Sequence, residues 1–123
     1  MKKLLIVEDE FILQMMIEKM VERIGHQIVG KAKSGDMAID LVKQEAPDVV
    51  LMDIKIIGKY DGIETVRKIR EFSDVPVLYL TGNTDPQIMK QAMDTQPMAF
   101  ITKPFEYKEL KTAIEKAIGA SNA

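Results

Sequence analysis

The chain has 123 residues, a hydrophobic share of 46% and a formal net charge of −2, which suit one folded domain of ordinary size. It contains no cysteine and a single histidine, His26, so disulfides, thiol catalysis and zinc sites built from several histidines are excluded. No basic stripe favours nucleic-acid binding, and no apolar run approaches the ~20 residues of a membrane span, so we expect a cytoplasmic protein that binds neither nucleic acid nor membrane directly.

Short apolar runs alternate with helical patterns along the whole chain. In chain order we expect a strand at 3–7, a helix at 10–24, a strand at 27–32, a helix from Ser34 to before Pro47, a strand at 48–52, a helix from Asp61-Gly62 through Ile69, a strand at 75–80, a helix from Asp85-Pro86, a strand at 98–102 and a helix between Pro104 and Gly119. The helix boundaries rest on cap residues. Gly25 suits a helix end, and Ser34 and Asp85 suit N-caps.

Five repeats of strand then helix predict an α/β fold with a doubly wound parallel sheet, a (βα)5 sandwich of three layers. The run 49–52 is apolar on both faces, as a strand covered on both sides should be. We expect one domain over 1–119, a frayed tail over 120–123 and no space for an appended output domain.

Acidic, hydroxyl and lysine side chains stand where the expected strands end. Glu8-Asp9-Glu10 follows the first strand, Asp53 the third, Thr81 the fourth and Lys103-Pro104 the fifth. In an open parallel sheet the ligand site lies beyond these carboxyl ends. Gathered carboxylates repel one another unless a cation neutralises them, and oxygen ligands without nitrogen or sulfur favour Mg²⁺. A cis bond before Pro104 would aim the Lys103 ammonium across the strand ends.

Taken together, these motifs resemble the response-regulator receiver domain of two-component signalling, from about residue 3 to 118. The resemblance rests on Ile6-Val7-Glu8-Asp9-Glu10, Val50-Leu51-Met52-Asp53, Asp61-Gly62, Leu80-Thr81-Gly82 and Phe100-Ile101-Thr102-Lys103-Pro104-Phe105. It implies a flavodoxin-like fold with the parallel sheet order 2-1-3-4-5 and a signalling domain that catalyses only its own phosphotransfer and dephosphorylation, not a conventional enzyme.

The resemblance also implies a role for each site residue. Asp53 matches the phosphoacceptor, a carboxylate that takes a phosphoryl group from a kinase histidine. Asp9 and Asp53 match direct Mg²⁺ ligands. Glu8 matches an acid that acts through a bound water, and the backbone carbonyl of Lys55 matches a further ligand. Thr81 matches a hydroxyl that bonds the phosphoryl group.

The remaining implied roles concern switching and partners. Lys103 matches a lysine that pairs with the phosphoryl group, and Phe100 a switch aromatic that turns inward. The implied partners are a sensor histidine kinase or histidine phosphotransfer protein and a downstream target. The target would meet the face made by the fourth helix, fifth strand and fifth helix, and the family also allows a dimer that forms on phosphorylation.

The sequence departs from the family pattern after the phosphoacceptor. The stretch 54–60 has no proline, which many members carry there, and is one residue longer than usual before Asp61-Gly62. Lys55 places a cation two residues past Asp53, where we hypothesise that it alters the lifetime of the acyl phosphate; a solvent-facing lysine is the plain alternative. Phe100 in turn suits a core aromatic as well as a switch.

Three other functions use similar elements. A Mg²⁺-dependent aspartyl phosphatase or phosphotransferase also uses an aspartate nucleophile at a strand end, but it usually carries a cap domain. A flavodoxin-like carrier of FMN needs a glycine- and hydroxyl-rich phosphate loop, where this chain has Glu8-Asp9-Glu10. A constitutive scaffold with the same fold would be insensitive to Asp53→Asn.

Overall fold

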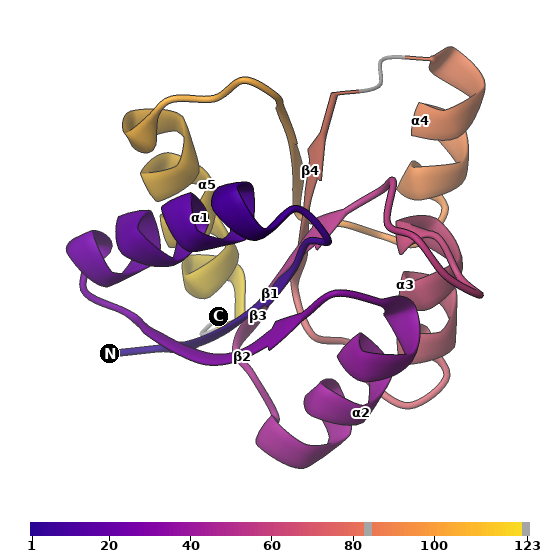
Figure 1. Ribbon diagram of the computed structural model, residues 1–123, viewed down its shortest axis with the longest axis horizontal. Helices are drawn as coiled ribbons and strands as arrows, with labels where there is room; N and C mark the ends of the chain where they lie inside the picture. Colours follow the sequence, from indigo (N-terminus) through magenta and orange to yellow (C-terminus); the bar gives the residue numbers. More distant parts are fainter. Residues whose placement is uncertain (83–84, 122–123) are drawn as a thin grey trace.

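Parallel strands form the centre of the fold. The computed structural model describes residues 1–82 and 85–121, and in this part of the chain five strands lie in the order β2-β1-β3-β4-β5 (Figure 1). The strands are β1 (Lys3–Val7), β2 (Gln27–Ala32), β3 (Val49–Asp53), β4 (Val77–Thr81) and β5 (Ala99–Thr102). All pairings are parallel, so the predicted fold class and strand order are confirmed.

Helices cover both faces of the sheet. They are α1 (Phe11–Ile24), α2 (Gly35–Glu45), α3 (Gly62–Arg70), α4 (Pro86–Met93) and α5 (Tyr107–Ser121). In Figure 1, α1 and α5 lie on one side of the strands, and α2, α3 and α4 lie on the other. Across the described ranges, no helix combines the length and the apolar character needed to cross a bilayer.

The predicted end of the last helix is wrong. The helix α5 continues through Gly119 to Ser121, so the expected tail at 120–123 begins inside a helix, and residues 122–123 lie outside the described part. Glycine weakens a helix by only about 1 kcal/mol relative to alanine. That cost is small beside the packing of Leu110, Ile114 and Ala117, which are fully buried against the sheet.

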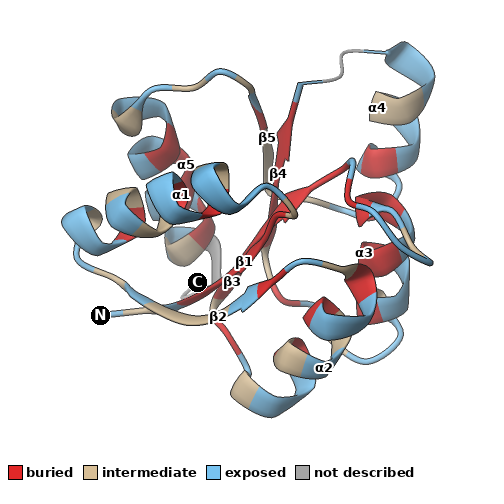
Figure 2. Cartoon of the chain, viewed as in Figure 1, coloured by how far each residue is buried: buried red, intermediate tan, exposed pale blue. Residues whose placement is uncertain are grey.

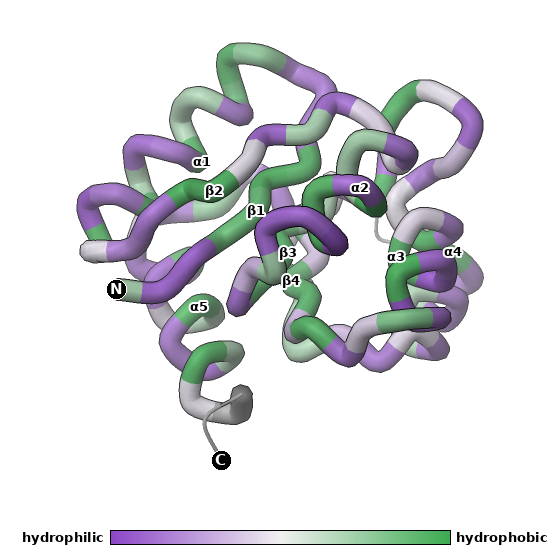
Figure 3. Tube along the Cα trace, turned by 90° about the horizontal axis from the view of Figure 1, so that it is seen from below, coloured by the Kyte–Doolittle hydropathy of each residue, from purple (hydrophilic) through white to green (hydrophobic). Residues whose placement is uncertain are grey.

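The core consists of two apolar layers separated by the sheet. All five residues of β3 and all five of β4 are buried (Figure 2), because both strands have helices on each side. The hydropathy colouring in Figure 3 shows apolar strands at the centre, surrounded by helices with polar residues on their outer sides. Ile17 and Val21 of α1 fill one layer, and Val66 and Ile69 of α3 fill the other.

Local signals in the sequence fix the helix ends as expected. Gly25 has φ +108° and donates its N–H to Val21 and Glu22 carbonyls, closing α1 in a left-handed conformation that favours glycine. The Ser34 side chain accepts the Met37 N–H at the start of α2. The α3 helix begins with a reciprocal capping box between Asp61 and Glu64.

The strand register brings the chemistry-bearing residues to one edge of the sheet. Val7 pairs with Met52, so the residues that follow them, Glu8 and Asp53, come side by side. Asp53 pairs with Leu80, and Thr81 pairs with Thr102 directly before Lys103. This register places the ends of four strands in a row.

A buried tyrosine joins the sheet to the end of α4. Tyr79 is fully buried in β4, and its hydroxyl lies 2.7 Å from Thr95 Oγ1. Thr95 donates its own hydroxyl to the Ala92 carbonyl at 2.6 Å, so Tyr79 is the donor to Thr95. The Tyr79 ring also stacks on Phe100 at a centroid distance of 5.5 Å. The buried hydroxyl therefore anchors the turn after α4 beneath an aromatic pair.

We predict that Tyr79→Phe lowers the free energy of unfolding by about 1 kcal/mol at neutral pH, because it removes one buried hydrogen bond and leaves the ring in place. Burial raises the pKa of Tyr79 to about 12 from 10.0. Between pH 10 and about 12, the folded protein therefore keeps the Tyr79 hydroxyl protonated, whereas the unfolded chain ionises it. The stabilisation is complete below pH 10 and disappears as the pH rises through about 12. Urea unfolding of both proteins measures the difference.

Tyr60→Phe is the matched control for this prediction, since it removes the same atom from a ring that is only half-buried. Equal stabilities for Tyr79→Phe and Tyr60→Phe at neutral pH would contradict the assigned role of the Tyr79 hydroxyl.

Candidate metal and phosphoryl site

Three carboxylates meet at the carboxyl edge of the sheet. Glu8 and Asp9 follow β1, and Asp53 is the last residue of β3. One oxygen from each lies within 4.8 Å of the others. Glu8 and Asp53 are buried, with exposures of 1% and 5%. The structure therefore brings together the acids that the sequence places at separate strand ends.

Lys103 joins two of these acids through its ammonium group. Its Nζ lies 3.0 Å from Glu8 Oε1 and 3.1 Å from Asp53 Oδ2. The Lys103–Pro104 peptide bond is cis, as the sequence allowed. The Lys103 N–H donates to the Thr81 carbonyl at 2.8 Å, so the ends of β4 and β5 are fastened together beside the acids.

The electrostatics of this cluster are unbalanced, because the Lys103 ammonium pairs with two of the three carboxylates. Burial raises the pKa of Glu8 to about 7, and the Asp53 charge acts in the same direction. Burial opposes the charged form of Lys103, but its hydrogen bond to Glu8 and the charge of Asp53 raise the Lys103 pKa overall. Without a second cation, the buried Glu8 carboxylate is therefore costly to ionise.

Each of the three carboxylates also accepts a backbone amide. The Glu10 N–H donates to Glu8 Oε2 at 3.1 Å. Lys55 donates to Asp53 Oδ1 at 3.2 Å, and Ile57 donates to Asp9 Oδ2 at 3.1 Å. These bonds orient the acids, but an amide carries no full charge to neutralise them.

The donor set fits a magnesium ion. Ligands on opposite sides of Mg²⁺ lie roughly 4 Å apart, since each Mg–O distance is about 2.1 Å. Neighbouring ligands of the ion lie roughly 3 Å apart, so the three oxygens, which lie within 4.8 Å of one another, would draw together by up to roughly 2 Å on binding. All three are oxygens, the class of ligand that Mg²⁺ prefers, and their excess negative charge is of the right sign.

The other predicted site residues are Thr81, Lys55 and Phe100, which differ in burial and in the groups they contact. Thr81 is buried at the end of β4. The Lys55 side chain is exposed, while its amide contacts Asp53. Phe100 is half-buried and stacks on Tyr79, so in this structure its ring already packs against the core.

Sequence reasoning missed Gln14, which supports Glu8 from α1. Gln14 is 5% exposed, and its Nε2 donates to the Glu8 carbonyl at 3.0 Å. It shares the buried stripe of α1 with Ile17 and Val21. An amide on an otherwise apolar helical stripe is the signal that could have revealed it, because a buried polar group needs a partner.

Comparison with known proteins identifies the family. The family model of the response regulator receiver domain matches residues 4–115. The transcriptional regulatory protein PdtaR of Mycobacterium tuberculosis is 34% identical over 117 residues, which make up 95% of this chain and 57% of that protein. The sporulation initiation phosphotransferase F of Bacillus subtilis is 28% identical over 116 residues, which cover 94% of this chain and 92% of that protein.

A solved structure matches the whole fold. The signal receiver domain of a modulated diguanylate cyclase from Desulfovibrio desulfuricans G20 superposes with a TM-score of 0.93 at 26% identity, covering 99% of this chain and 97% of that one. Several curated relatives are longer proteins, and the chain spans 57% of PdtaR and 47% of a probable transcriptional regulator ycf27 of Guillardia theta.

We predict that Asp53→Asn raises the free energy of unfolding in the absence of divalent cations, by about 1 kcal/mol, because it removes one charge from a cluster that a single ammonium cannot balance. Chemical unfolding in the presence of a chelator measures the change. Asp40→Asn, on the exposed surface of α2, is the control and should behave like the native chain. An Asp53→Asn protein no more stable than this control would contradict the charge imbalance.

Proposed function

The chain belongs to the response regulator receiver domain family, and we propose from this that it is a phosphorylation-controlled switch whose phosphoacceptor is Asp53. The observation that carries the proposal is the position of the Asp53 carboxylate, 3.1 Å from the Lys103 ammonium and within 4.8 Å of Glu8 and Asp9 oxygens. Phosphoryl transfer needs positioning and charge neutralisation more than covalent machinery; the cluster positions Asp53, and Lys103 together with the proposed Mg²⁺ would supply the positive charge.

In the proposed reaction, an Asp53 carboxylate oxygen attacks the phosphorus of a phosphohistidine. The new O–P bond forms as the P–N bond breaks, and the electron pair of that bond returns to the histidine nitrogen. Asp53 becomes an acyl phosphate, with Glu8, Asp9, Asp53 and the carbonyl of Lys55 as the proposed protein contacts of Mg²⁺. The bound ion would supply positive charge beside the developing phosphoryl oxygens.

Lys103 and Thr81 then respond to the new charge in this proposal. A phosphorylated aspartate carries more negative charge and more acceptor oxygens than the free side chain. The Lys103 ammonium would exchange its carboxylate partners for a phosphoryl oxygen, and the Thr81 hydroxyl would bond another. Phe100, which lies on the strand beside Thr81, would report this movement at the surface.

The proposed partners follow from this chemistry. The donor is a sensor histidine kinase or a histidine phosphotransfer protein in the cytoplasm, and the downstream target is a protein. The proposed output surface contains exposed or half-exposed side chains of α4 and α5, among them Met89, Gln91, Met93, Lys108 and Lys111. A dimer formed through this surface on phosphorylation belongs to the same proposal, as does the absence of direct nucleic-acid contacts.

The site geometry supports this function better than the alternatives. A flavin carrier needs a phosphate-binding loop after the first strand, where Glu8 and Asp9 would repel a phosphate. A phosphatase for metabolites needs an accessible nucleophile and a substrate pocket around it. Asp53 is 5% exposed and pairs with Lys103, so steady turnover of a phosphate ester by the native chain would be needed to favour a phosphatase.

We predict that incubation with a small acyl-phosphate donor and Mg²⁺ adds one phosphoryl group to the chain, as measured by intact mass. The addition should be lost in Asp53→Asn and greatly reduced when a chelator removes the metal, since both the nucleophile and the neutralising charge are required. Asp40→Asn should be labelled like the native chain. Labelling that persists in Asp53→Asn, or no labelling of the native chain, would contradict the proposal.

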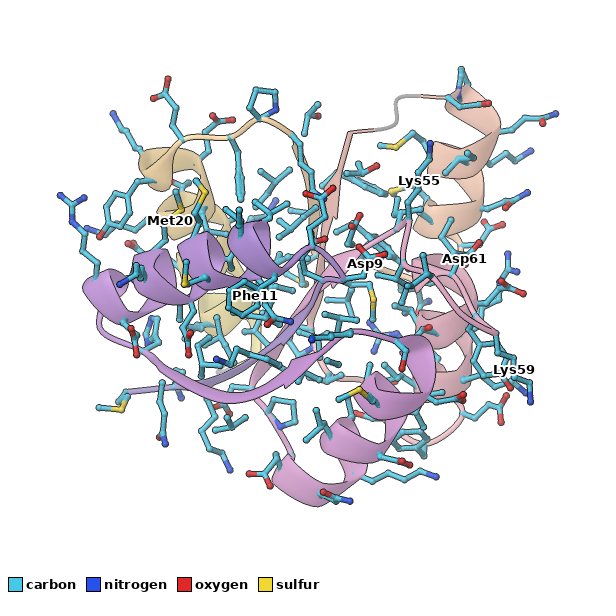
Figure 4. All side chains as sticks on the ribbon, in the orientation of Figure 1. Asp9, Phe11, Met20, Lys55, Lys59 and Asp61 are labelled. Carbon is cyan, nitrogen blue, oxygen red and sulfur yellow. The ribbon has the colours of Figure 1, made fainter. Side chains whose placement is uncertain are left out.

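We also predict that the Lys55 side chain prolongs the life of the acyl phosphate. Lys55 and Lys59 lie on the same loop, but the Lys55 amide contacts Asp53, whereas Figure 4 shows Lys59 at the outer tip, away from Asp9. A surface ion pair is worth about 0.5–1 kcal/mol, which corresponds to a roughly two- to fivefold faster loss of phosphate in Lys55→Ala. Lys59→Ala is the matched control. Equal dephosphorylation rates for the two variants would end this hypothesis.

A further inference from the structure

The loop that joins β3 to α3, residues 54–61, holds two of the three site carboxylates through its backbone. Its amides at Lys55 and Ile57 donate to Asp53 and Asp9, at 3.2 and 3.1 Å. Asp53 belongs to the strand that leads into the loop, whereas Asp9 lies 48 residues from Ile57 in sequence. The loop therefore forms a bridge between the ends of β1 and β3.

The loop is anchored well enough to hold this position. Ile54 and Ile56 are buried in the core, at 3% and 7% exposure. The Gly62 N–H donates to the Ile54 carbonyl at 2.7 Å, which closes the loop at its base. A side chain at Gly62 would collide with the Asp53 carbonyl, so this close approach requires glycine. Gly58, directly after Ile57, has φ +116°, a conformation that favours glycine.

At position 57 the backbone amide, and not the side chain, makes the contact with the site. The Ile57 side chain is 73% exposed, so it contributes little to the core. The amide is available because the loop contains no proline, which would have no N–H to donate. Lys103 contacts Glu8 and Asp53, whereas Asp9 is held by this amide.

We propose that the Ile57 amide is a positioning group for the metal site. It fixes Asp9 through Oδ2 and leaves the other carboxylate oxygen to serve as a ligand, so the loop and the cation bind cooperatively. The inference rests on the Mg²⁺ site of the proposed function. Hydrogen bonds to metal ligands orient them, and their removal commonly weakens metal binding by a factor of ten or more. By linkage, metal bound at Asp9 must in turn stabilise the loop.

The first test compares Ile57→Pro with Ile57→Ala. The proline variant removes the donor, and the alanine variant keeps it while losing the same exposed side chain. We expect calorimetric titration with MgCl₂ to give a dissociation constant about tenfold weaker for Ile57→Pro. The constant for Ile57→Ala should stay within about twofold of that of the native chain, because its hydrogen bond remains. Equal constants for the two variants, or tighter binding by Ile57→Pro, would overturn the inference.

The second test uses the native chain, so that it does not depend on how well the proline variant folds. Amide hydrogen exchange at Ile57, measured by NMR, should slow severalfold when MgCl₂ saturates the site, since linkage stabilises the closed loop. Exchange at Lys59, at the loop tip, should change less. Unchanged or faster exchange at Ile57 would overturn the inference. Failure of the native chain to bind Mg²⁺ at all would instead overturn the proposed function on which it rests.

Discussion

The mutual repulsion of Glu8, Asp9 and Asp53 is the constraint on which the site depends. Three carboxylates with oxygens within 4.8 Å of one another repel, and the Lys103 ammonium pairs with two of them, Glu8 and Asp53. This repulsion is confined to one edge of the sheet, whose central strands are otherwise buried in apolar contacts. An unbalanced cluster of this kind attracts positive charge, and any change in its charge alters the balance among its members.

In the proposed switch, a change in this cluster would be transmitted because the site is built from four separate strand ends. The Lys103 amide is tied to the Thr81 carbonyl, and Phe100, three residues before Lys103, stacks on Tyr79. Tyr79 in turn holds Thr95 after α4. A change in the partners of Lys103 can therefore reach the turn after α4 through packed groups. In Figures 1 and 3, α4 lies next to α3 on this face of the sheet.

Much of this could be predicted from the sequence, because the signals are local. Apolar runs that stop at acids gave the strand ends, and cap residues such as Ser34 gave the helix starts. Contacts made by the backbone could not be predicted in this way. The identity of residue 57 does not indicate that its backbone amide donates to Asp9. In the sequence, Tyr79 looks like an ordinary strand residue, and only the folded structure shows its hydrogen bond to Thr95. The end of α5 was missed because packing outweighed the weak signal of Gly119.

The most direct test of the account is whether one divalent cation binds at this edge of the sheet. Mn²⁺ can replace Mg²⁺ at oxygen sites, and its unpaired electrons broaden nearby NMR signals. At substoichiometric Mn²⁺, we expect the amide signals of Glu8, Asp9, Asp53 and Lys55 to disappear first, and excess Mg²⁺ to restore them. Broadening centred on other acidic residues, or spread evenly over the surface, would show that the gathered carboxylates are not a metal site.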